Sequence, residues 1–287
     1  GNVVVAAEQP GYPTPQAAVE AFASALEAPG YDALLTLFGR SHKEIIQPSD
    51  PAIAEINKQH MASIIKEYWA LREDGPDRDT VLMGFDAWPL PIPLVRESGQ
   101  WRFATELAAD EILNRRIGNN ELNAIHVLRA YVDAQRQYAR EDHMGDGVLQ
   151  YAQKLGSSPG KRDGLYWPAD VAKGEEASPF GPLVAEAGAY LKGHKEGDGY
   201  KGYRFKILTR QAASAPGGAY NYVINGRMIA GFAMLAYPDS HGETGVMSFI
   251  VSHGGKVYQK DLGANTEKLA GSMKSYDPGP GWHLVDD

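Results

Sequence analysis

The sequence contains no cysteine, and this absence excludes several kinds of chemistry. Disulfide bonds, thiolate nucleophiles and cysteine-ligated metals all require that residue. The chain also lacks an uninterrupted apolar run of about 18 residues, the length that a bilayer-spanning helix needs. Basic residues are outnumbered, with 28 Lys and Arg against 36 Asp and Glu and a formal net charge of -8. We therefore expect no transmembrane segment in this sequence and no nucleic-acid partner, which would usually require a basic patch.

Motifs for catalysis and metal binding are scarce as well. Residues 156–160 match the pattern Gly-x-Ser-x-Gly, but Pro159 lacks the backbone N–H that a nucleophile elbow places in its oxyanion hole. The eight histidines form no His-x-x-x-His pair. The acidic loop at residues 142–147 lacks the alternating ligand positions of a calcium loop. The sequence therefore predicts no catalytic residue, no metal site and no cofactor.

The length and composition are those of a soluble globular protein with more than one domain. The chain has 287 residues, of which 43% are hydrophobic and 22% charged, as is typical of soluble folds. Two domains accommodate that length more easily than one. We predict an α+β fold, with an N-terminal α+β domain at residues 1–105 and a second domain at residues 106–287.

The N-terminal domain is expected to begin with helices and to end with strands. Thr14 followed by Pro15 is typical of a helix start, and Asp50 is a typical helix cap. The predicted helices cover residues 15–28, 32–38 and 51–69. After a polar loop at residues 73–79, three strand-like runs follow, at residues 80–85, 91–96 and 101–105. These runs predict a small antiparallel sheet that packs against the helices.

The longest helical pattern covers residues 119–140, and we expect the second domain to form around it. Its apolar face consists of Leu122, Ile125, Leu128, Tyr131 and Val132. Gly118 is expected to separate this helix from a helical stretch at residues 106–116, and Asn119 or Asn120 to cap its first turn.

The remainder of the second domain is predicted to contain strands without crossover helices. The strand-like runs lie at residues 203–209, 219–224, 228–237, 245–252 and 256–260. Without helices between them, an antiparallel meander packed on the long helix is expected. Residues 142–200 are interpreted as a long ordered insertion that is anchored by aromatic residues such as Trp167, Phe180 and Tyr190.

Six polar residues are the candidates for a ligand site between the two domains. They are Arg115, Arg116, Asn119, Glu121, Gln135 and Arg227. Two guanidinium groups beside amides and a carboxylate could hold an anionic ligand. In the alternative interpretation the cluster is a helix junction, in which the arginines contact helix-end carbonyls or acidic partners. We favour the structural interpretation, because a buried arginine usually serves as a paired tether.

Strings along almost the whole chain, from about Thr14 onward, resemble one bacterial family. They include Trp88-Pro-Leu-Pro-Ile-Pro-Leu-Val95, Gly99-Gln-Trp-Arg-Phe103, Arg115-Arg-Ile-Gly-Asn-Asn-Glu-Leu122, Asp163-Gly-Leu-Tyr-Trp-Pro168, Gly217-Gly-Ala-Tyr-Asn-Tyr222 and Asn225-Gly-Arg-Met-Ile-Ala-Gly-Phe232. The sequence resembles the bacterial domain-of-unknown-function family 2950. The resemblance implies an exported protein with a periplasmic or extracellular location, and it supplies no catalytic residues.

Two further features bear on export and architecture. The chain begins Gly-Asn-Val-Val-Val without methionine, as a mature protein would after removal of a signal peptide, although an internal fragment would look the same. The C-terminal half is similar to the globular part of type IV pilins and pseudopilins, in which a helix packs on a meander. The apolar half-helix that drives pilin assembly is missing.

The sequence therefore favours an exported bacterial protein with a non-enzymatic structural or interaction role in the cell envelope. Its expected partner is an envelope protein or a small ligand. The alternative is a small-ligand binder or hydrolase with its site between the two domains.

Overall fold

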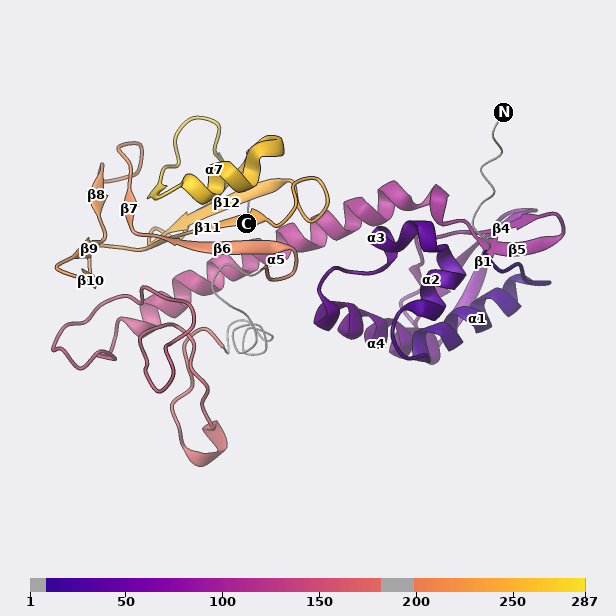
Figure 1. Ribbon diagram of the computed structural model, residues 1–287, viewed down its shortest axis with the longest axis horizontal. Helices are drawn as coiled ribbons and strands as arrows, with labels where there is room; N and C mark the ends of the chain where they lie inside the picture. Colours follow the sequence, from indigo (N-terminus) through magenta and orange to yellow (C-terminus); the bar gives the residue numbers. More distant parts are fainter. Residues whose placement is uncertain (1–8, 182–198, 287) are drawn as a thin grey trace. The chain divides into compact units, whose positions relative to one another are not determined.

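The computed structural model describes residues 9–181 and 199–286, and the chain forms two compact units (Figure 1). One unit covers Gly1–Arg115 and the other Arg116–Asp287. Each combines helices with antiparallel strands, which confirms the predicted α+β class. The domain boundary that we placed after residue 105 stays a prediction.

The helices of the first unit begin at the capping residues identified in the sequence. Helix α1 covers Pro15–Glu27, and the Thr14 hydroxyl accepts a hydrogen bond from the Ala17 backbone N–H at 3.1 Å. The Asp50 carboxylate caps α4, which covers Pro51–Glu67, by accepting from the Ala52 N–H at 2.9 Å. The shorter elements between them are α2 Asp32–Phe38, η1 Arg40–His42 and α3 Lys43–Ile46. Each cap satisfies a backbone donor that a helix start leaves unpaired.

The sheet of the first unit contains a strand that the sequence analysis missed. Its strands are β1 Trp69–Gly75, β2 Arg78–Met83, β3 Trp88–Pro89, β4 Leu94–Glu97 and β5 Gln100–Phe103, in the order β1-β2-β4-β5 with β3 beside β2. Of the residues 73–79 that were predicted as a loop, 73–75 belong to β1, an edge strand exposed at Glu73 and Asp74, and 78–79 belong to β2. Trp69 opens that strand instead of ending α4, because Tyr68 is already extended, with φ -168°.

The core of the first unit is organised around three phenylalanine rings. Phe22 from α1, Phe38 from α2 and Phe103 from β5 are buried, and their ring centroids lie 5.1–5.8 Å apart in edge-to-face contacts. Such geometry aligns the positive edge of one ring with the negative face of the next. Helices and sheet are therefore joined by residues from three separate elements.

The long helix α5 is continuous over Ala109–Tyr138, which corrects the prediction of two helices. Gly118 lies inside it with an ordinary φ, and neither Asn119 nor Asn120 begins a helix. A glycine weakens a helix by only about 1 kcal/mol, so a single glycine need not end it. The predicted face is shifted too, since Leu122 is 68% exposed whereas Leu128 and Tyr131 are buried. In the part of the chain that the structure describes, no helix is both long and apolar enough to cross a bilayer.

Gly118→Ala is expected to stabilise the protein by about 0.5–1 kcal/mol, since alanine favours a helix interior. A Cβ atom at this position meets nothing within 4 Å. Gly99 is the matched control because its Cβ would also meet open space, but its φ is +77°. Gly99→Ala should therefore destabilise by about 1 kcal/mol. Urea unfolding of both variants measures the difference, and a lower midpoint for Gly118→Ala would contradict a continuous helix.

The second unit encloses an antiparallel sheet between two helices. The order is β15-β13-β12-β11-β6, comprising β6 Tyr203–Leu208, β11 Ala233–Pro238, β12 Met247–Ser252, β13 Val257–Asp261 and β15 His283–Leu284. Figure 1 shows α5 on one face and α7, Thr266–Ser272, on the other. On the α7 face, Lys206 donates to the Gly271 carbonyl at 2.8 Å. The predicted antiparallel sheet is confirmed, but the strand expected at residues 219–224 lies outside it, in β8 and β9. The likeness to pilins stays a prediction.

Short strands and turns complete the second unit. They are β7 Arg210–Gln211, β8 Tyr220–Asn221, β9 Val223–Ile224, β10 Arg227–Met228, β14 Ser275–Tyr276, η3 Val171–Lys173 and η4 Gly263–Asn265. In the first unit, η2 Thr105–Leu107 precedes α5. Strand β14 pairs with β7 in parallel, unlike its neighbours. In the predicted insertion, Trp167 and Phe180 are buried as expected, while Tyr190 lies outside the described residues.

Asp163 closes a loop in this insertion. Its carboxylate accepts hydrogen bonds from the Ser158 N–H at 2.7 Å, the Ser158 hydroxyl at 2.8 Å and the Lys154 ammonium at 2.9 Å. Burial alone would raise the pKa of Asp163, but these hydrogen bonds outweigh burial and lower it to about 2. The serine of the rejected nucleophile motif therefore donates its hydroxyl proton to a carboxylate within this loop.

Asp163→Asn is expected to lower the free energy of unfolding by about 2 kcal/mol at pH 7. The folded pKa lies below the unfolded value, so the carboxylate stabilises the fold above about pH 4, and this contribution is lost as the pH falls toward 2. Urea midpoints of parent and variant should differ at pH 7 and approach each other below pH 4. Asp86→Asn, at an exposed carboxylate, is the control and should leave the urea midpoint unchanged both at pH 7 and below pH 4. A difference that is independent of pH would contradict the assignment.

Candidate functional site

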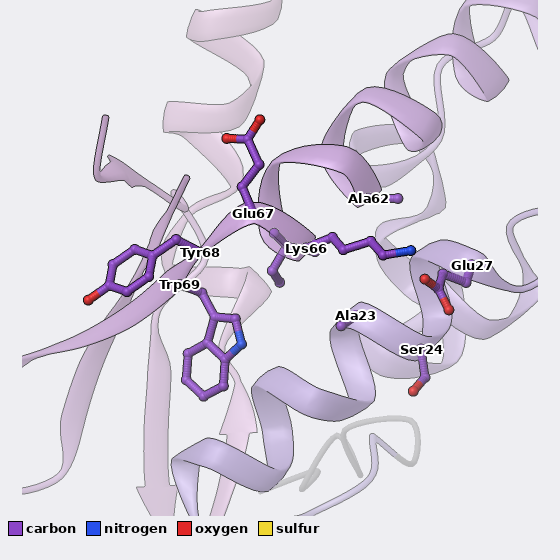
Figure 2. Close-up of a pocket in the computed structure, with 9 residues that line it drawn as sticks. Ala23, Ser24, Glu27, Ala62, Lys66, Glu67, Tyr68 and Trp69 are labelled. Carbon is purple, nitrogen blue, oxygen red and sulfur yellow. The ribbon is translucent and has the colours of Figure 1, made fainter. Parts of the chain in front are cut away.

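A cavity of about 430 Å³ lies in the first unit where α1, α4 and the start of β1 meet. Ala23, Ser24 and Glu27 come from α1, Ala62, Ile65, Lys66 and Glu67 from α4, and Tyr68 and Trp69 from the chain that follows. Figure 2 shows the Lys66 side chain extending toward the Glu27 carboxylate, with the Trp69 indole facing α1. The lining combines charged groups of both signs with an indole surface. Such a cavity suits a small polar ligand better than an apolar one.

Three large aromatic side chains are exposed near this cavity, and we refer to Tyr68, Phe85 and Trp88 as the aromatic patch. Their exposed fractions are 51%, 79% and 40%. The Tyr68 and Phe85 rings are nearly parallel, with centroids 6.0 Å apart. Trp88 pairs across β2 with Met83, which in turn pairs with Trp69, so the patch lies at one end of the sheet. Exposed aromatic residues at one end of a sheet are typical of an interaction surface.

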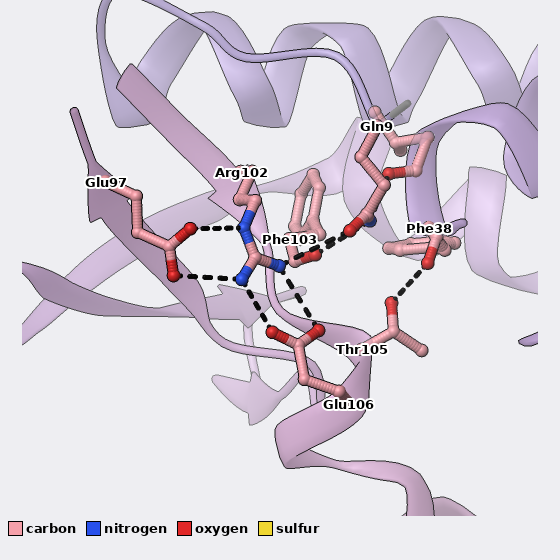
Figure 3. Close-up of polar contacts among 8 residues, drawn as sticks. Gln9, Phe38, Glu97, Arg102, Phe103, Thr105 and Glu106 are labelled. Carbon is pink, nitrogen blue, oxygen red and sulfur yellow. Dashed lines mark hydrogen bonds and ion pairs between the residues drawn. The ribbon is translucent and has the colours of Figure 1, made fainter. Parts of the chain in front are cut away.

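Arg102 on β5 is the centre of the most extensive polar network in the first unit (Figure 3). Its guanidinium forms two hydrogen bonds to Glu97, both at 3.0 Å, and two to Glu106, at 2.6 and 3.2 Å. Hydrogen bonds from Arg102 lower the pKa of Glu106. Gln9 joins the network, and its amide donates to the Leu37 and Phe103 carbonyls at 3.0 and 2.9 Å. The guanidinium donors are thus used within the protein, which makes Arg102 a structural tether.

The adjacent candidate arginines belong to different units. In the first unit, Arg115 pairs with Glu111 one turn earlier on α5, lies 5.6 Å over the Trp88 ring and donates to the Pro89 carbonyl at 3.4 Å. In the second unit, burial lowers the pKa of Arg116, and Glu243 partly offsets the effect. The proposed helix junction does not exist, because α5 passes through both positions. Arg115 has the paired environment that the structural interpretation requires.

Three of the other candidates, Glu121, Gln135 and Arg227, are held by contacts within the second unit. Glu121 accepts from the backbone N–H groups of Val246 and Met247, both at 3.0 Å. Gln135 is fully buried and pairs with both backbone groups of Ala152.

Arg227 donates to the Asp146 carboxylate at 2.8 Å, and Asn119 is exposed on α5. Glu121 and Gln135 are separated by fourteen helical positions, about 21 Å at the α-helical rise. The fold therefore does not bring these two together, and the ligand-binding role of the six residues stays a prediction.

One group of side chains with metal-ligand chemistry comes together only in the fold. Ligand atoms of Glu141, His143 and Glu176 all lie within 4.8 Å of one another. The sequence predicted no metal site, because metal motifs are recognised by ligands at short, regular spacings and Glu176 lies in a distant loop. A nearby His and Glu were visible, but no sequence signal pointed to the third residue.

Comparison with known proteins identifies one family for this chain. Residues 9–285 match the family described as Protein of unknown function (DUF2950). No match was found among the curated proteins or the solved structures. The matched range covers nearly the whole chain, both units included, which confirms the resemblance seen in its sequence strings. The chain belongs to the DUF2950 family.

Proposed function

We propose that this protein is exported and has a non-enzymatic interaction role in the bacterial cell envelope. The observation that carries this proposal is the aromatic patch of Tyr68, Phe85 and Trp88 on the first unit. With Arg115 over Trp88, the patch combines aromatic rings with a guanidinium, the composition that dominates binding energy in protein interfaces. The partner that fits this chemistry is a protein surface.

The contacts of the polar candidates support a binding role over a catalytic one. Glu121 and Gln135 pair with backbone groups, and Arg227 pairs with Asp146. A catalytic group has to reach a substrate, and side chains that already satisfy the backbone cannot do so without opening the fold.

Site-specific photocrosslinking in the cells that produce the full-length protein tests the interaction. A photoreactive phenylalanine analogue at position 85 should yield one discrete crosslinked protein, and the double variant Tyr68→Ser, Trp88→Ser should abolish it. The analogue at exposed Glu20 on α1 is the control and should give no such product. No crosslink at position 85, or one that the double variant leaves unchanged, would overturn the proposed surface.

Cell fractionation tests export separately. The full-length protein should be recovered with periplasmic or extracellular markers. Recovery with cytoplasmic markers would contradict export and leave the aromatic patch to be judged by crosslinking alone.

A further inference from the structure

We propose that Glu141, His143 and Glu176 bind a divalent transition-metal ion of the Zn²⁺ class. The three residues contribute one imidazole nitrogen and two carboxylate oxygens, all within 4.8 Å of one another. Imidazole ligands suit zinc and its neighbours, whereas calcium requires six to eight oxygen atoms. Three protein ligands would leave one position of a tetrahedral zinc ion open for water or for a partner's side chain.

The required movement is small. Ligand atoms about 2.0–2.2 Å from a tetrahedral zinc ion lie about 3.3–3.5 Å apart. Closing from the observed separation therefore takes a shift of about 1 Å at the ends of side chains. Glu141 and Glu176 are exposed and His143 is half-buried, so the carboxylates can adjust without disturbing the core.

Aromatic contacts hold the histidine and the distant glutamate in place. The His143 ring centroid lies 4.4 Å from that of Tyr138 and 5.3 Å from that of Trp167. The Trp167 indole N–H donates to the Glu176 backbone carbonyl at 3.0 Å, which positions this segment beside the ring. Trp167 thus contacts two of the three proposed ligands, and such outer contacts fix the orientation of metal-binding side chains.

The electrostatic setting favours a cation. Helix α5 ends at Tyr138, and Glu141 follows three residues later, with its N–H donating to the Tyr138 carbonyl. The C-terminus of a helix carries partial negative charge from its aligned peptide dipoles, which adds to the two carboxylates. One cation already lies at the cluster: the Arg162 guanidinium is 2.6 Å from one oxygen of Glu176.

Arg162 competes with the proposed metal ion for the Glu176 carboxylate, and this competition can be tested. Its pair with Glu176 is exposed on both sides, at 44% and 43%, so the interaction is worth only about 0–1 kcal/mol. A metal ion can therefore share or displace it. Removing the guanidinium should strengthen metal binding, an effect that general destabilisation of the fold would not produce.

Isothermal titration with ZnCl₂ tests the site on full-chain protein that is free of affinity tags and has been treated with chelator. We expect one zinc ion per chain, and at least about ten-fold weaker binding for His143→Gln and for Glu176→Gln. His126→Gln, at an exposed histidine on α5, is the control and should bind like the parent. Arg162→Gln should bind more tightly.

Each result decides the question. Parent-like affinity of both His143→Gln and Glu176→Gln, or no parent binding tighter than about 1 mM, would overturn the proposal. Melting temperatures of the metal-free variants show whether His143→Gln disturbs its aromatic contacts. If it does, Glu141→Gln and Glu176→Gln carry the test, because their side chains are exposed. Equal or tighter response to CaCl₂ would replace the zinc class by an oxygen-preferring ion and would also overturn it.

Discussion

Gln135→Leu is expected to lower the free energy of unfolding by about 2–5 kcal/mol, although leucine is apolar and of similar size. The Gln135 amide donates to the Ala152 carbonyl at 2.7 Å and accepts from the Ala152 N–H at 2.8 Å, and both residues are buried. Leucine would leave these two backbone groups unpaired, and each buried unpaired group costs about 1–3 kcal/mol. The amide also donates to the Tyr131 hydroxyl at 3.1 Å, which would lose that partner.

Urea unfolding followed by circular dichroism measures this loss. Gln137→Leu, two positions along the same helix and exposed, provides the control and should change the midpoint little. If both variants unfolded at the parent's midpoint, the amide would not be the link between α5 and the segment after it.

Phe22→Ala is expected to destabilise the first unit by about 3–5 kcal/mol. The ring is fully buried and contacts the rings of Phe38 and Phe103 at centroid distances of 5.3 and 5.8 Å. Alanine would remove one member of the trio and leave a cavity that the fixed neighbours cannot fill. The change should therefore appear in the unfolding transition of the first unit.

Phe85→Ala is the matched control, because it makes the same chemical change in the same unit at a side chain that is 79% exposed. Its effect on stability should stay below about 0.5 kcal/mol. Comparable losses for the two variants would contradict the assignment of Phe22 to the core and Phe85 to the surface. A stable Phe85→Ala protein would also provide a folded reagent for testing the aromatic patch.

The two proposed sites can be tested independently, since their residues belong to different units. The aromatic patch lies within Gly1–Arg115, and the proposed metal ligands lie within Arg116–Asp287. Variants at Phe85 should therefore leave zinc binding unchanged, and variants at His143 should leave the crosslink at position 85 unchanged. A failure of one proposal does not decide the other.

Local signals in the sequence predicted many elements correctly. Thr14 and Asp50 cap the helices that they were expected to cap. The two strand-like runs on either side of residues 97–100 pair as β4 and β5, and Ser98 and Gly99 between them adopt φ values of 50° and 77°. The antiparallel order of the second sheet followed from the absence of crossover helices in the sequence. These features depend on steric and hydrogen-bonding preferences that act over a few neighbouring residues.

The incorrect predictions of secondary structure concern positions where a local preference is weak. Gly118 is a local helix breaker, yet it lies inside α5, and the polar residues 73–74 belong to an edge strand. Pairing with β2 outweighs the local preference in the strand, and in α5 a single glycine costs only about 1 kcal/mol, too little to end the helix. Leu122 was expected in the core but is exposed, and its neighbour Glu121 is the residue that contacts the sheet, through the Val246 backbone N–H.

By itself the sequence determined the α+β class, the positions of most helices and strands, and membership of the DUF2950 family. Only the tertiary structure decided that Gln135 pairs with Ala152, that Glu121 pairs with Val246, and that a carboxylate oxygen of Glu176 lies within 4.8 Å of a ring nitrogen of His143. A helix cap or a hairpin turn depends only on residues that are close together in the sequence. A polar partner depends on which distant segments pack together, and residue spacing along the chain does not encode that choice.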